Sequence, residues 1–414
     1  MISVDKARSI VLKHARLMDI EKVDLLSSLG RAIAQDITAP YDTPPWDNSA
    51  MDGYAVRFED IKSASADKPV GLKVIDDLPA GYLSKKCVKA SDAIRIMTGA
   101  IIPEGADTVV RKEDTSLSND TVQIFVPPHK GENLRLAGEN VKRGDCVVRK
   151  GTTLRPPHIG MFASLGISYV SVYQRPRVAI LSTGDEIREI DSASDFSKII
   201  NSNTYSISSQ VKACGAIPVM LGIARDNEKD LIAKLQNGLR ADVIITTGGV
   251  SVGEYDYVKD ALEAIGTKIE FWKVAMRPGK PITFGTLEDK LIFGLPGNPV
   301  SCMISFEQFV RPALLKKMGY KYLQRPCLWA TAKEDFKAKK DLTYFLRVRL
   351  SYQDGELTAT TTGDQGSGII KSMVEANGLM IVLPDKKEVK AGEQMMVQIL
   401  ERGFELEGQR IHDM

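Results

Sequence analysis

The regular alternation of short apolar runs with helix-like segments between residues 177 and 310 is the feature that most constrains the fold. At its centre lies the stretch DVIITTGGVSVGEYD, residues 242–256, where an apolar run ends at two glycines. Such a run is typical of a strand buried on both faces of a parallel sheet, and paired glycines let a ligand approach the backbone closely. A helix pattern follows at residues 257–265, so the stretch predicts a loop that faces phosphate groups.

Further strand patterns continue this alternation at residues 178–181, 218–223 and 290–293. Each is followed by a polar loop and then by a segment with apolar residues at helical spacing. Strands that alternate with helices predict a central, doubly wound and mostly parallel α/β domain with right-handed crossovers.

The segments on either side have other patterns. Residues 3–17 predict an amphipathic helix with Ser3 as its N-cap, and residues 57–140 hold short strand-like runs that predict an inserted β-rich module. Before that module, residues 43–56 read TPPWDNSAMDGYAV, a loop held in shape by apolar residues, in which Asp52-Gly53 favours a turn. After Pro326 the strand pattern returns, with a hairpin signal in a small C-terminal β domain.

Composition argues against several classes of protein. The 414 residues carry a net charge of +2, which gives no reason to expect a nucleic-acid binder. No apolar run is long enough to cross a bilayer, and the first residues do not resemble a signal peptide, so we expect no membrane partner. Five widely spaced cysteines without a CxxC pair suit a reducing cytoplasm.

Polar side chains follow four of the predicted strands, namely Glu186, Asp226, Asp256 and Asn298. Because ligands of open α/β sheets bind at the carboxyl ends of the strands, we expect these side chains to converge. Three carboxylates from separate loops suit a hard cation such as Mg²⁺, with phosphate oxygens completing its coordination. The alternative makes Asp226 a helix N-cap and Glu186 a solvated loop residue.

A basic loop, MRPGKPITFG at residues 276–285, is the counterpart of these acids. Arg277 and Lys280 flank a rigid Pro-Gly pair, an arrangement that suits an oxyanion or a phosphate, although an exposed basic turn would have the same composition. Neither GxxxxGK[ST] nor GxGxxG occurs, which disfavours a P-loop NTPase and a Rossmann dehydrogenase.

Two other functional classes compete with a phosphate-handling enzyme. Residues 249–253 match the G-x-S-x-G elbow of α/β-hydrolases, but the one histidine after Ser251 is His412, in a charged tail, so Ser251 fits a substrate contact better than a nucleophile. A non-catalytic scaffold that uses the α/β domain to dock partners is the other alternative. The acids together with Arg277 and Lys280 favour the enzyme.

Eight motifs in order resemble the molybdopterin molybdenumtransferase family, which includes the C-terminal domain of gephyrin. They are DNSAMDGYA, MTGA, GENLRLAGEN, STGDE, TTGGVSVGEYDY, RPGKP, GLPGNPVS and TTTGDQGSG, and the match extends from about residue 23 to residue 383. The resemblance implies an enzyme that takes adenylylated molybdopterin and molybdate, releases AMP with the help of Mg²⁺, and leaves molybdenum on the dithiolene.

The resemblance also implies a fold in four parts and a homodimer. The parts are a split N-terminal mixed domain (1–43 and 141–174), the inserted β-rich module (44–140), the α/β molybdopterin-binding domain (175–322) and a C-terminal β-barrel domain (323–414). The cleft would combine the α/β domain of one subunit with the inserted module of the other. Molybdopterin adenylyltransferase and cofactor-accepting enzymes are the implied protein partners.

Site residues follow from the motifs one by one. Glu186, Asp226 and Asp256 resemble the metal and phosphate carboxylates, and Asp52, Thr98 and Arg135 the contributions of the partner subunit. On the cofactor-binding side, the motifs assign Gly248, Gly249, Ser251 and Asn298 to the nucleotide-pterin site, and Arg277, Lys280, Pro281, Ser301, Arg347 and Ser367 to the molybdate and substrate anion site. Asn140 stands where many family members have an acid, so it is left out of the site.

Overall fold

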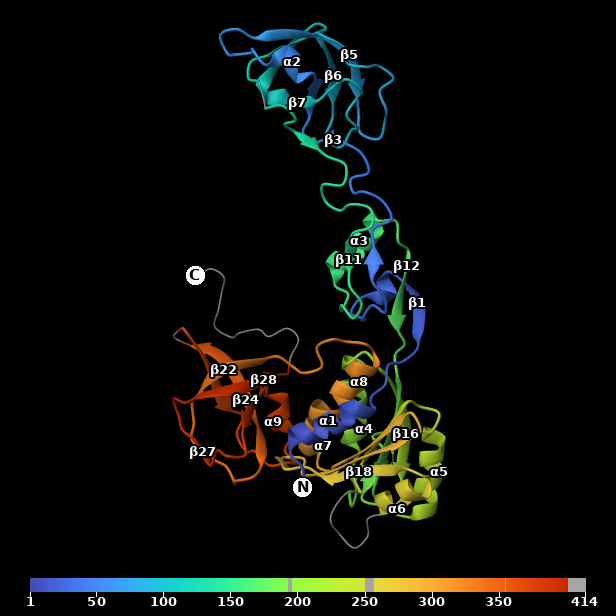
Figure 1. Cartoon of the computed structure of the whole chain (residues 1–414). Coiled ribbons are helices and arrows are strands. Elements are labelled where there is room, and N and C mark those ends of the chain that lie inside the picture. Colours follow the sequence, from blue (N-terminus) through green and yellow to red (C-terminus); the bar gives the residue numbers. More distant parts are fainter. Residues whose placement is uncertain (128, 193–195, 250–256, 354, 401–414) are drawn as a thin grey trace.

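The chain folds into an elongated molecule in which three bodies follow one another (Figure 1). The computed structural model describes residues 1–127, 129–192, 196–249, 257–353 and 355–400. The inserted module lies at one end, a small mixed body lies in the middle, and the α/β unit and the C-terminal barrel lie together at the other end (Figure 1). Within the described ranges, every helix is too short or too polar to cross a lipid bilayer.

The α/β unit is built on a six-stranded sheet in the order β16-β13-β17-β21-β20-β18. The first four strands are parallel and the last two are antiparallel. The strands are β13 (Arg177–Thr183), β16 (Ile217–Ala224), β17 (Val243–Thr247), β18 (Lys268–Lys273), β20 (Pro281–Leu287) and β21 (Lys290–Leu295). Every residue of β17 is buried, as predicted for a strand covered on both faces.

Helices cover both faces of this sheet. One face packs against α4 (Ser202–Ala213), α7 (Pro299–Ser305) and α8 (Arg311–Lys317), and the other against α5 (Glu228–Gly238) and α6 (Tyr257–Ala264). The alternation of side chains along β13 explains this: Val178 and Ile180 face the first group, whereas Ala179 and Leu181 face the second. The paired faces form the largest core of the molecule.

The first helix, α1 (Val4–His14), begins at the predicted N-cap, Ser3, whose hydroxyl accepts a hydrogen bond from the N–H of Lys6. Its apolar side chains Val4, Ala7 and Val11 are buried in the core of the α/β unit. The helix therefore packs with the α/β unit rather than with the split segment to which its place in the chain assigned it.

The middle body joins the two sides of the insertion. Strand β1 (Ile20–Asp24) pairs with β12 (Tyr169–Tyr173), and β2 (Ile37–Thr38) pairs with β11 (Cys146–Val148), both antiparallel. Helix α3 (Pro156–Ser164) contributes Phe162 to the core between them. Two chain segments far apart in sequence thus make one small body that carries the module.

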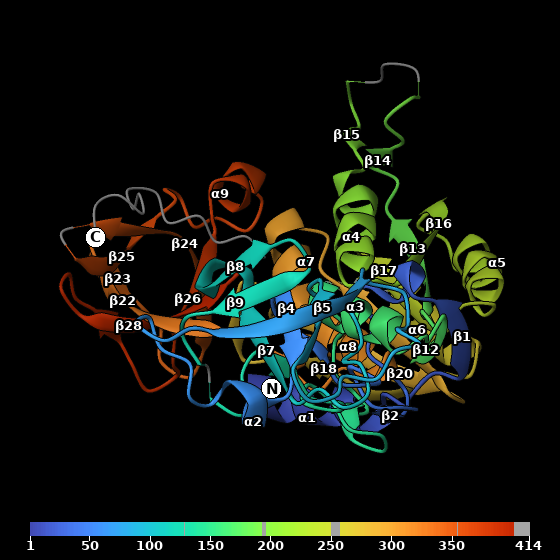
Figure 2. The same ribbon diagram turned by 90° about the horizontal axis from the view of Figure 1, so that it is seen from above.

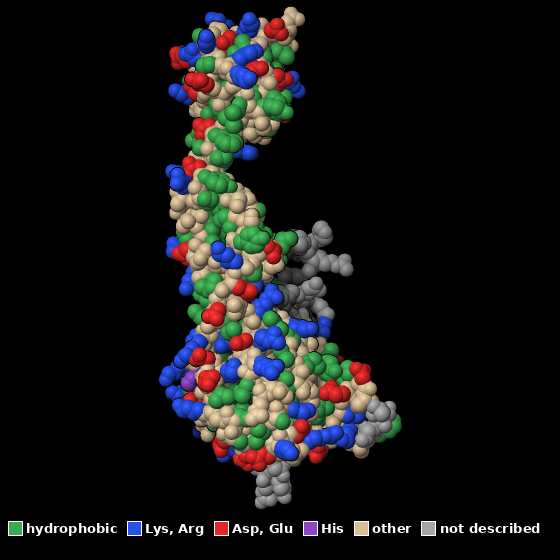
Figure 3. Space-filling view, turned by 90° about the vertical axis from the view of Figure 1, so that its right-hand side faces the viewer, with side chains coloured by type: hydrophobic (Ala, Val, Ile, Leu, Met, Phe, Trp, Pro, Cys, Tyr) green, Lys and Arg blue, Asp and Glu red, His purple; other side chains and the backbone are tan. Residues whose placement is uncertain are grey.

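The inserted module is a six-stranded sheet in the order β7-β4-β6-β5-β9-β8, with helix α2 (Phe58–Ile61) beside it. Its strands are β4 (Gly53–Val56), β5 (Val70–Leu78), β6 (Asp92–Ile96), β7 (Thr108–Arg111), β8 (Thr115–Ser118) and β9 (Thr121–Ile124). A narrow neck separates it from the rest (Figure 3). The turn expected at Asp52-Gly53 is replaced by the start of β4. Gly53 lets the backbone of Val110 come so close that a Cβ on residue 53 would lie 1.9 Å from the carbonyl oxygen of Val110.

The C-terminal unit is a closed five-stranded barrel, which confirms the predicted small β barrel. The strands run in the order β24-β25-β22-β28-β26, and β26 pairs back with β24. They are β22 (Cys327–Ala332), β24 (Thr343–Gln353), β25 (Glu356–Thr361), β26 (Gly378–Val382) and β28 (Gln394–Ile399). A two-residue strand of the α/β unit, β19 (Met276–Arg277), pairs with the start of β24 and joins the two units.

Candidate active site

A cleft of about 420 Å³ opens at the carboxyl ends of β13, β17 and β21. The register places Thr183, Thr247 and Leu295 at the ends of these neighbouring strands, so the loops that follow them lie side by side. Five residues predicted for the site line the cleft, namely Glu186, Gly248, Gly249, Pro281 and Asn298. The edge of the sheet thus gathers loops that the sequence pattern had only placed after separate strands.

The two glycines of the central loop are required by close packing. Gly248 has φ +92°, and a Cβ there would lie 2.7 Å from the carbonyl oxygen of Thr183. Gly249 has φ +63°, and a Cβ there would lie 2.4 Å from Cγ2 of Val258. Any larger residue would push the loop away from the sheet. The two glycines therefore keep the loop backbone close to the strand ends and leave room in the cleft for a ligand.

A buried network of hydroxyl groups forms the floor of the cleft. The hydroxyl of Ser182 lies 2.7 Å from that of Thr204 and 2.9 Å from that of Thr247, and it donates to Oδ1 of Asn201 at 3.0 Å. This network was not predicted from the sequence, although the motifs STG (182–184) and TTG (246–248), each at the end of a predicted strand, indicate hydroxyl groups there. The network holds the ends of β13, β17 and α4 together and fixes the shape of the floor.

The predicted metal carboxylates lie on loops after adjacent parallel strands. The Glu186 carboxylate lines the cleft and folds back over Gly184, and it makes no hydrogen bond or ion pair with another described residue. Oδ2 of Asp226 accepts a hydrogen bond from the N–H of Asp185 at 3.1 Å, and Asp226 does not line the described cleft. Asp256 and Ser251 lie outside the described residues.

These oxygen donors fit Mg²⁺ chemically, because Mg²⁺ is commonly bound by one or two carboxylates, with water and substrate phosphate oxygens completing its coordination. No group of three or more Asp, Glu, His or Cys side chains able to hold a metal occurs among the described residues. Among the described residues that line the cleft, Glu186 carries the carboxylate, and it has no hydrogen-bond or ion-pair partner in the described part of the chain.

A second cleft, of about 320 Å³, lies between the α/β unit and the barrel. It is lined by four cations, Arg277, Lys337, Lys339 and Arg347, and by one acid, Asp364. Among the described residues, none of the four forms an ion pair with a carboxylate, and Arg277 instead lies 6.0 Å from the ring centre of Tyr344. The cleft is therefore suited to an oxyanion. Lys337 and Lys339 were not predicted, although the run FKAKK marks them.

Arg347 is 1% exposed and holds the loop that follows β25. Its Nε donates to the hydroxyl of Ser372 at 3.1 Å, and its NH2 group donates to the carbonyl oxygens of Asp364 and Gly366 at 3.2 and 3.0 Å. Burial lowers the pKa of Arg347 to about 10, and the charge of Asp364 opposes part of this shift. The guanidinium thus stays charged at neutral pH and shapes the cleft as well as lining it.

A contact at the start of α7 connects the linings of the two clefts: Asn298 and Pro299 line the first, and Ser367 follows Gly366, which lines the second. The N–H of Val300 donates to the carbonyl oxygen of Ser367 at 3.1 Å, which ties the barrel loop to this helix beside Ser301. The loop RPGKP also lies on α7, since a Cβ at Gly279 would be 2.6 Å from the hydroxyl oxygen of Ser305. Lys280 is exposed at the end of this loop.

Three family models together match most of the chain. They are described as the MoeA N-terminal region (domain I and II), residues 2–166, a probable molybdopterin binding domain, residues 179–316, and the MoeA C-terminal region (domain IV), residues 330–400. A protein of Haemophilus influenzae named molybdopterin molybdenumtransferase is 36% identical over 96% of this chain and 98% of its own length. The chain belongs to the molybdopterin molybdenumtransferase family. The predicted resemblance is confirmed.

Other members of the family agree in sequence and in fold. A molybdopterin molybdenumtransferase of Nostoc sp. is 42% identical over 75% of this chain and 72% of its own length. The crystal structure of a molybdopterin biosynthesis moeA protein from Pyrococcus horikoshii OT3 superposes with a TM-score of 0.83 at 30% identity, covering 97% of this chain and all of that one. These relatives are named as transferases and match most of the chain. They confirm the predicted transferase, rather than the serine hydrolase or the non-catalytic scaffold.

The remaining predicted residues of the molybdopterin molybdenumtransferase site lie together in the inserted module. The Asp52 carboxylate is bonded to Thr98, and β10 (Leu134–Arg135) pairs with β3 (Asn48–Ser49) so that Arg135 lies opposite Asn48. The hydrogen bond from the N–H of Gly99 to the carbonyl oxygen of Ser49 brings the two loops together. Within one chain this group lies at the far end of the molecule from the α/β cleft (Figure 1).

Proposed function

We propose that this protein inserts molybdenum from molybdate into adenylylated molybdopterin, releases AMP and yields molybdenum cofactor, with Mg²⁺ as the required cation. The observation that supports the proposal is the connection of two chemically different clefts through the Val300–Ser367 hydrogen bond at the start of α7. One cleft has the glycine-rich, hydroxyl-rich character of a nucleotide and phosphate site, and the other is lined by cations that form no ion pair with a carboxylate of the described residues.

The α/β cleft would hold the adenylylated end of the substrate. Gly248 and Gly249 keep the loop backbone close to the strand ends, and Asn298, the N-cap of α7, lines the cleft without a side-chain cap hydrogen bond. Glu186, with Asp226 and Asp256, would hold Mg²⁺ there. Bound at such a site, Mg²⁺ neutralises a phosphoanhydride and polarises its phosphorus.

The cationic cleft would hold molybdate. Arg277 and Arg347 line this cleft, and Lys280, on the same loop as Arg277, would add charge. Ser301 and Ser367, beside the Val300–Ser367 hydrogen bond, would add hydroxyl donors. A tetrahedral dianion held there would be placed next to the substrate, so a bimolecular step would become a positioned one. No histidine base or covalent nucleophile is required by this arrangement.

We further propose that the working enzyme is a homodimer whose cleft is completed by Asp52, Thr98 and Arg135 of a second copy. Support comes from exposed apolar side chains beside both half-sites, which mark interaction surfaces. In the module these are Trp46, Met51 and Leu136, which are 50%, 43% and 55% exposed. Beside the α/β cleft, Ile199 and Ile200 are 67% and 46% exposed on the paired strands β14 (Ile187–Arg188) and β15 (Ile199–Ile200), which project beyond α4 (Figure 2).

The remaining partners follow from the chemistry of substrate and product. An adenylylated dithiolene and its molybdenum product are both reactive, so we propose molybdopterin adenylyltransferase as the supplier and cofactor-accepting enzymes as the recipients. A cytoplasmic location suits the three exposed free thiols, Cys87, Cys146 and Cys327.

The test is a single-turnover reaction with purified adenylylated molybdopterin. We expect AMP to be released only when molybdate and Mg²⁺ are both present, in a 1:1 ratio with molybdenum retained on the pterin. Replacing molybdate by sulfate at equal concentration is the control for a general anion effect. Release of AMP without molybdenum insertion would show a hydrolase that cleaves the phosphoanhydride of adenylylated molybdopterin with water instead.

A further inference from the structure

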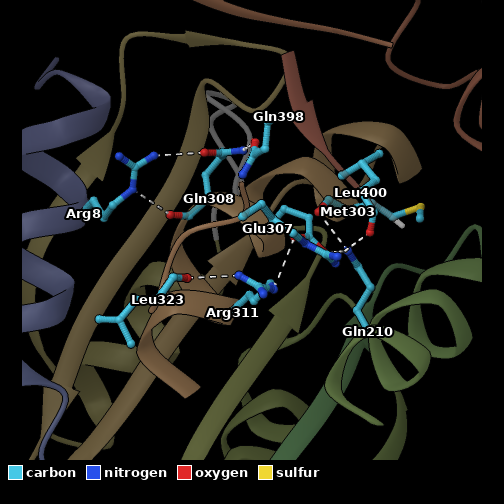
Figure 4. Close-up of polar contacts among 10 residues, drawn as sticks. Arg8, Gln210, Met303, Glu307, Gln308, Arg311, Leu323, Gln398 and Leu400 are labelled. Carbon is cyan, nitrogen blue, oxygen red and sulfur yellow. Dashed lines mark hydrogen bonds and ion pairs between the residues drawn. The ribbon is translucent and has the colours of Figure 1, made fainter. Parts of the chain in front are cut away.

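A buried polar joint connects the α/β unit to the barrel at the middle of one long helix (Figure 4). Between α7 and α8 the helix makes one π-helical turn, Phe306–Val310, and all five side chains of this turn are buried. A π-turn inserts an extra residue into the helix, and such turns occur mostly where the extra residue has a function. Here the turn brings Glu307 and Gln308 to the interface.

Glu307 is 5% exposed and contacts three polar side chains, those of Arg325, Gln210 and Arg311. Arg325, in the linker to the barrel, donates from Nε and NH2 to its two carboxylate oxygens at 3.0 and 3.1 Å. Gln210 of α4 donates at 3.3 Å, and Arg311 forms an ion pair at 3.8 Å. Arg325 also donates to the carbonyl oxygen of Leu400, directly after the last barrel strand.

Gln308 is 1% exposed and joins three segments. Its Nε2 donates to Oε1 of Gln398 in β28 at 2.7 Å, and its Oε1 accepts from Arg8 of α1 at 2.9 Å. Gln398 is 4% exposed, so both amides of this pair are withdrawn from water. A buried amide pair of this kind has a strong preference for one geometry, because any displacement leaves a donor or an acceptor unsatisfied.

Gln398 stands in the same cross-strand row as Arg347. Leu379 of β26 is directly opposite Arg347 of β24 and directly opposite Gln398 of β28. Side chains directly opposite on neighbouring strands point to the same face, so all three leave the barrel wall in one direction. Leu379 packs into the core of the α/β unit, which shows that this row faces that unit.

The row of Arg347, Leu379 and Gln398 is therefore held to the α/β unit at both ends, by contacts near the anion cleft and by the polar joint. Near Arg347, the pairing of β19 with β24 and the Val300–Ser367 hydrogen bond hold the barrel. An attachment on this side alone would leave the barrel free to pivot about it. The Gln308–Gln398 pair holds the other end of the row, two strands away, roughly 10 Å at the spacing of strands in a sheet.

Stability alone does not explain a joint built this way. Replacing a buried ion pair with apolar residues of similar size is often neutral or stabilising, whereas the directional bonds of such a pair select one geometry. The joint consists of directional hydrogen bonds and ion pairs, although apolar side chains could bury the same surface area. Its construction therefore favours one orientation of the barrel.

We propose that Gln308, Gln398 and Glu307 are positioning residues for the oxyanion cleft: the π-turn sets the angle of the barrel and thereby the place of Arg347 relative to the RPGKP loop. This rests on the proposed function, because molybdate is the oxyanion assigned to that cleft. None of the three residues lines either cleft in the described part of the chain.

The test replaces Gln398 with Met, which keeps the length of the side chain and removes one hydrogen bond. We expect the molybdate concentration for half-maximal AMP release to rise by about threefold to thirtyfold, the range seen when residues couple sites without touching the ligand. The half-saturating concentration of adenylylated molybdopterin and the rate at saturating molybdate should change by less than about twofold. Gln394→Met is the matched control, since Gln394 lies on the same strand and its side chain, among the described residues, bonds to Thr331 on the barrel surface.

Two outcomes would overturn the inference. One is a folded Gln398→Met protein with the molybdate midpoint of the wild type, and the other is an equal loss of affinity for both substrates. Glu307→Gln, which removes the charge but keeps the shape, should shift the molybdate midpoint in the same direction, so a folding defect in one variant leaves the other as the test. Equilibrium dialysis with molybdate alone separates the two proposals: if the wild type binds molybdate but releases no AMP, the proposed function fails while positioning is still judged by the shift in molybdate affinity.

Discussion

The Asp52 carboxylate accepts two hydrogen bonds from Thr98, one from the backbone N–H at 2.7 Å and one from the hydroxyl at 2.8 Å. The two residues are 46 positions apart in the chain and come together at one edge of the inserted module. These bonds stabilise the ionised form, so they lower the pKa of Asp52, and Lys112 and Arg95 add to the effect. The acid is thereby kept charged at the surface of the module, as its proposed place in the shared cleft requires.

Thr98→Val should raise the pKa of Asp52 toward its ordinary value, because the hydroxyl bond is lost while the backbone bond remains. A carboxylate whose folded-state pKa is depressed contributes stability above its unfolded-state pKa and loses that contribution as pH falls through the folded-state pKa. Asp52 of the variant should therefore take up its proton at a higher pH than Asp52 of the wild type. A ¹³C NMR titration of the carboxyl groups measures this, with Asp335, whose pKa is lowered by Ala391 and Lys390, as internal reference. An unchanged Asp52 titration would show that the hydroxyl bond is absent in solution.

Mixed dimers test the shared cleft. Asp52→Ala and Glu186→Ala should each abolish most AMP release when alone, since each removes one half of every site. A heterodimer of the two variants, purified with two affinity tags, should recover up to about half of the wild-type activity, because one of its two clefts is then intact. Purified heterodimers that stay as inactive as the parents would place the cleft within one chain.

Gly248→Ala should destabilise the protein and impair the nucleotide cleft. The positive φ alone costs about 1–2 kcal/mol for a residue with a Cβ, and overpacking against the carbonyl of Thr183 adds about 1–3 kcal/mol. Gly392→Ala is the matched control: its φ is +87°, close to the +92° of Gly248, and nothing lies within 4 Å of the added Cβ. Urea unfolding of both variants gives the difference, and equal losses of free energy would contradict the close packing at Gly248.

Arg347→Lys should weaken molybdate binding although it keeps the positive charge. Lysine cannot donate to Ser372 and to the carbonyl oxygens of Asp364 and Gly366 at the same time, so the loop after β25 loses its support. With charge-assisted bonds worth about 1.5–3 kcal/mol each, we expect the molybdate midpoint to rise by about tenfold to a hundredfold.

The control for this variant is Arg349→Lys, two residues further along β24 and exposed. It should leave the molybdate midpoint as in the wild type. Amide hydrogen exchange at Val300 gives a second measurement, because its N–H is bonded to the supported loop at Ser367. Faster exchange at Val300 in Arg347→Lys alone is expected. Equal molybdate midpoints for the two arginine variants would move the anion site elsewhere.

Local sequence patterns predicted the parts of this protein whose burial follows a simple period. The fully buried run of β17, the N-cap at Ser3 and the strands β24 and β25 on either side of Asp354-Gly355 lie where the pattern indicated, because apolar spacing and turn residues report on local structure. The order of the motifs likewise predicted the family. Glu186, Gly248, Gly249 and Asn298 could be assigned to one cleft because the ends of parallel strands must meet at one edge.

Contacts between distant segments were decided only by the tertiary structure. The bond between Asp52 and Thr98, the packing of α1 on the α/β sheet and the row from Arg347 to Gln398 join residues whose separation in the chain leaves no local period to read. The π-turn at Glu307 and Gln308 has the same origin. Met303, Phe306 and Val310 have the spacing of an ordinary helix, and the extra residue is favoured by the contacts that the turn makes with the linker and the barrel. Periodicity records which side of an element is buried, whereas the identity of the partner depends on how the elements pack.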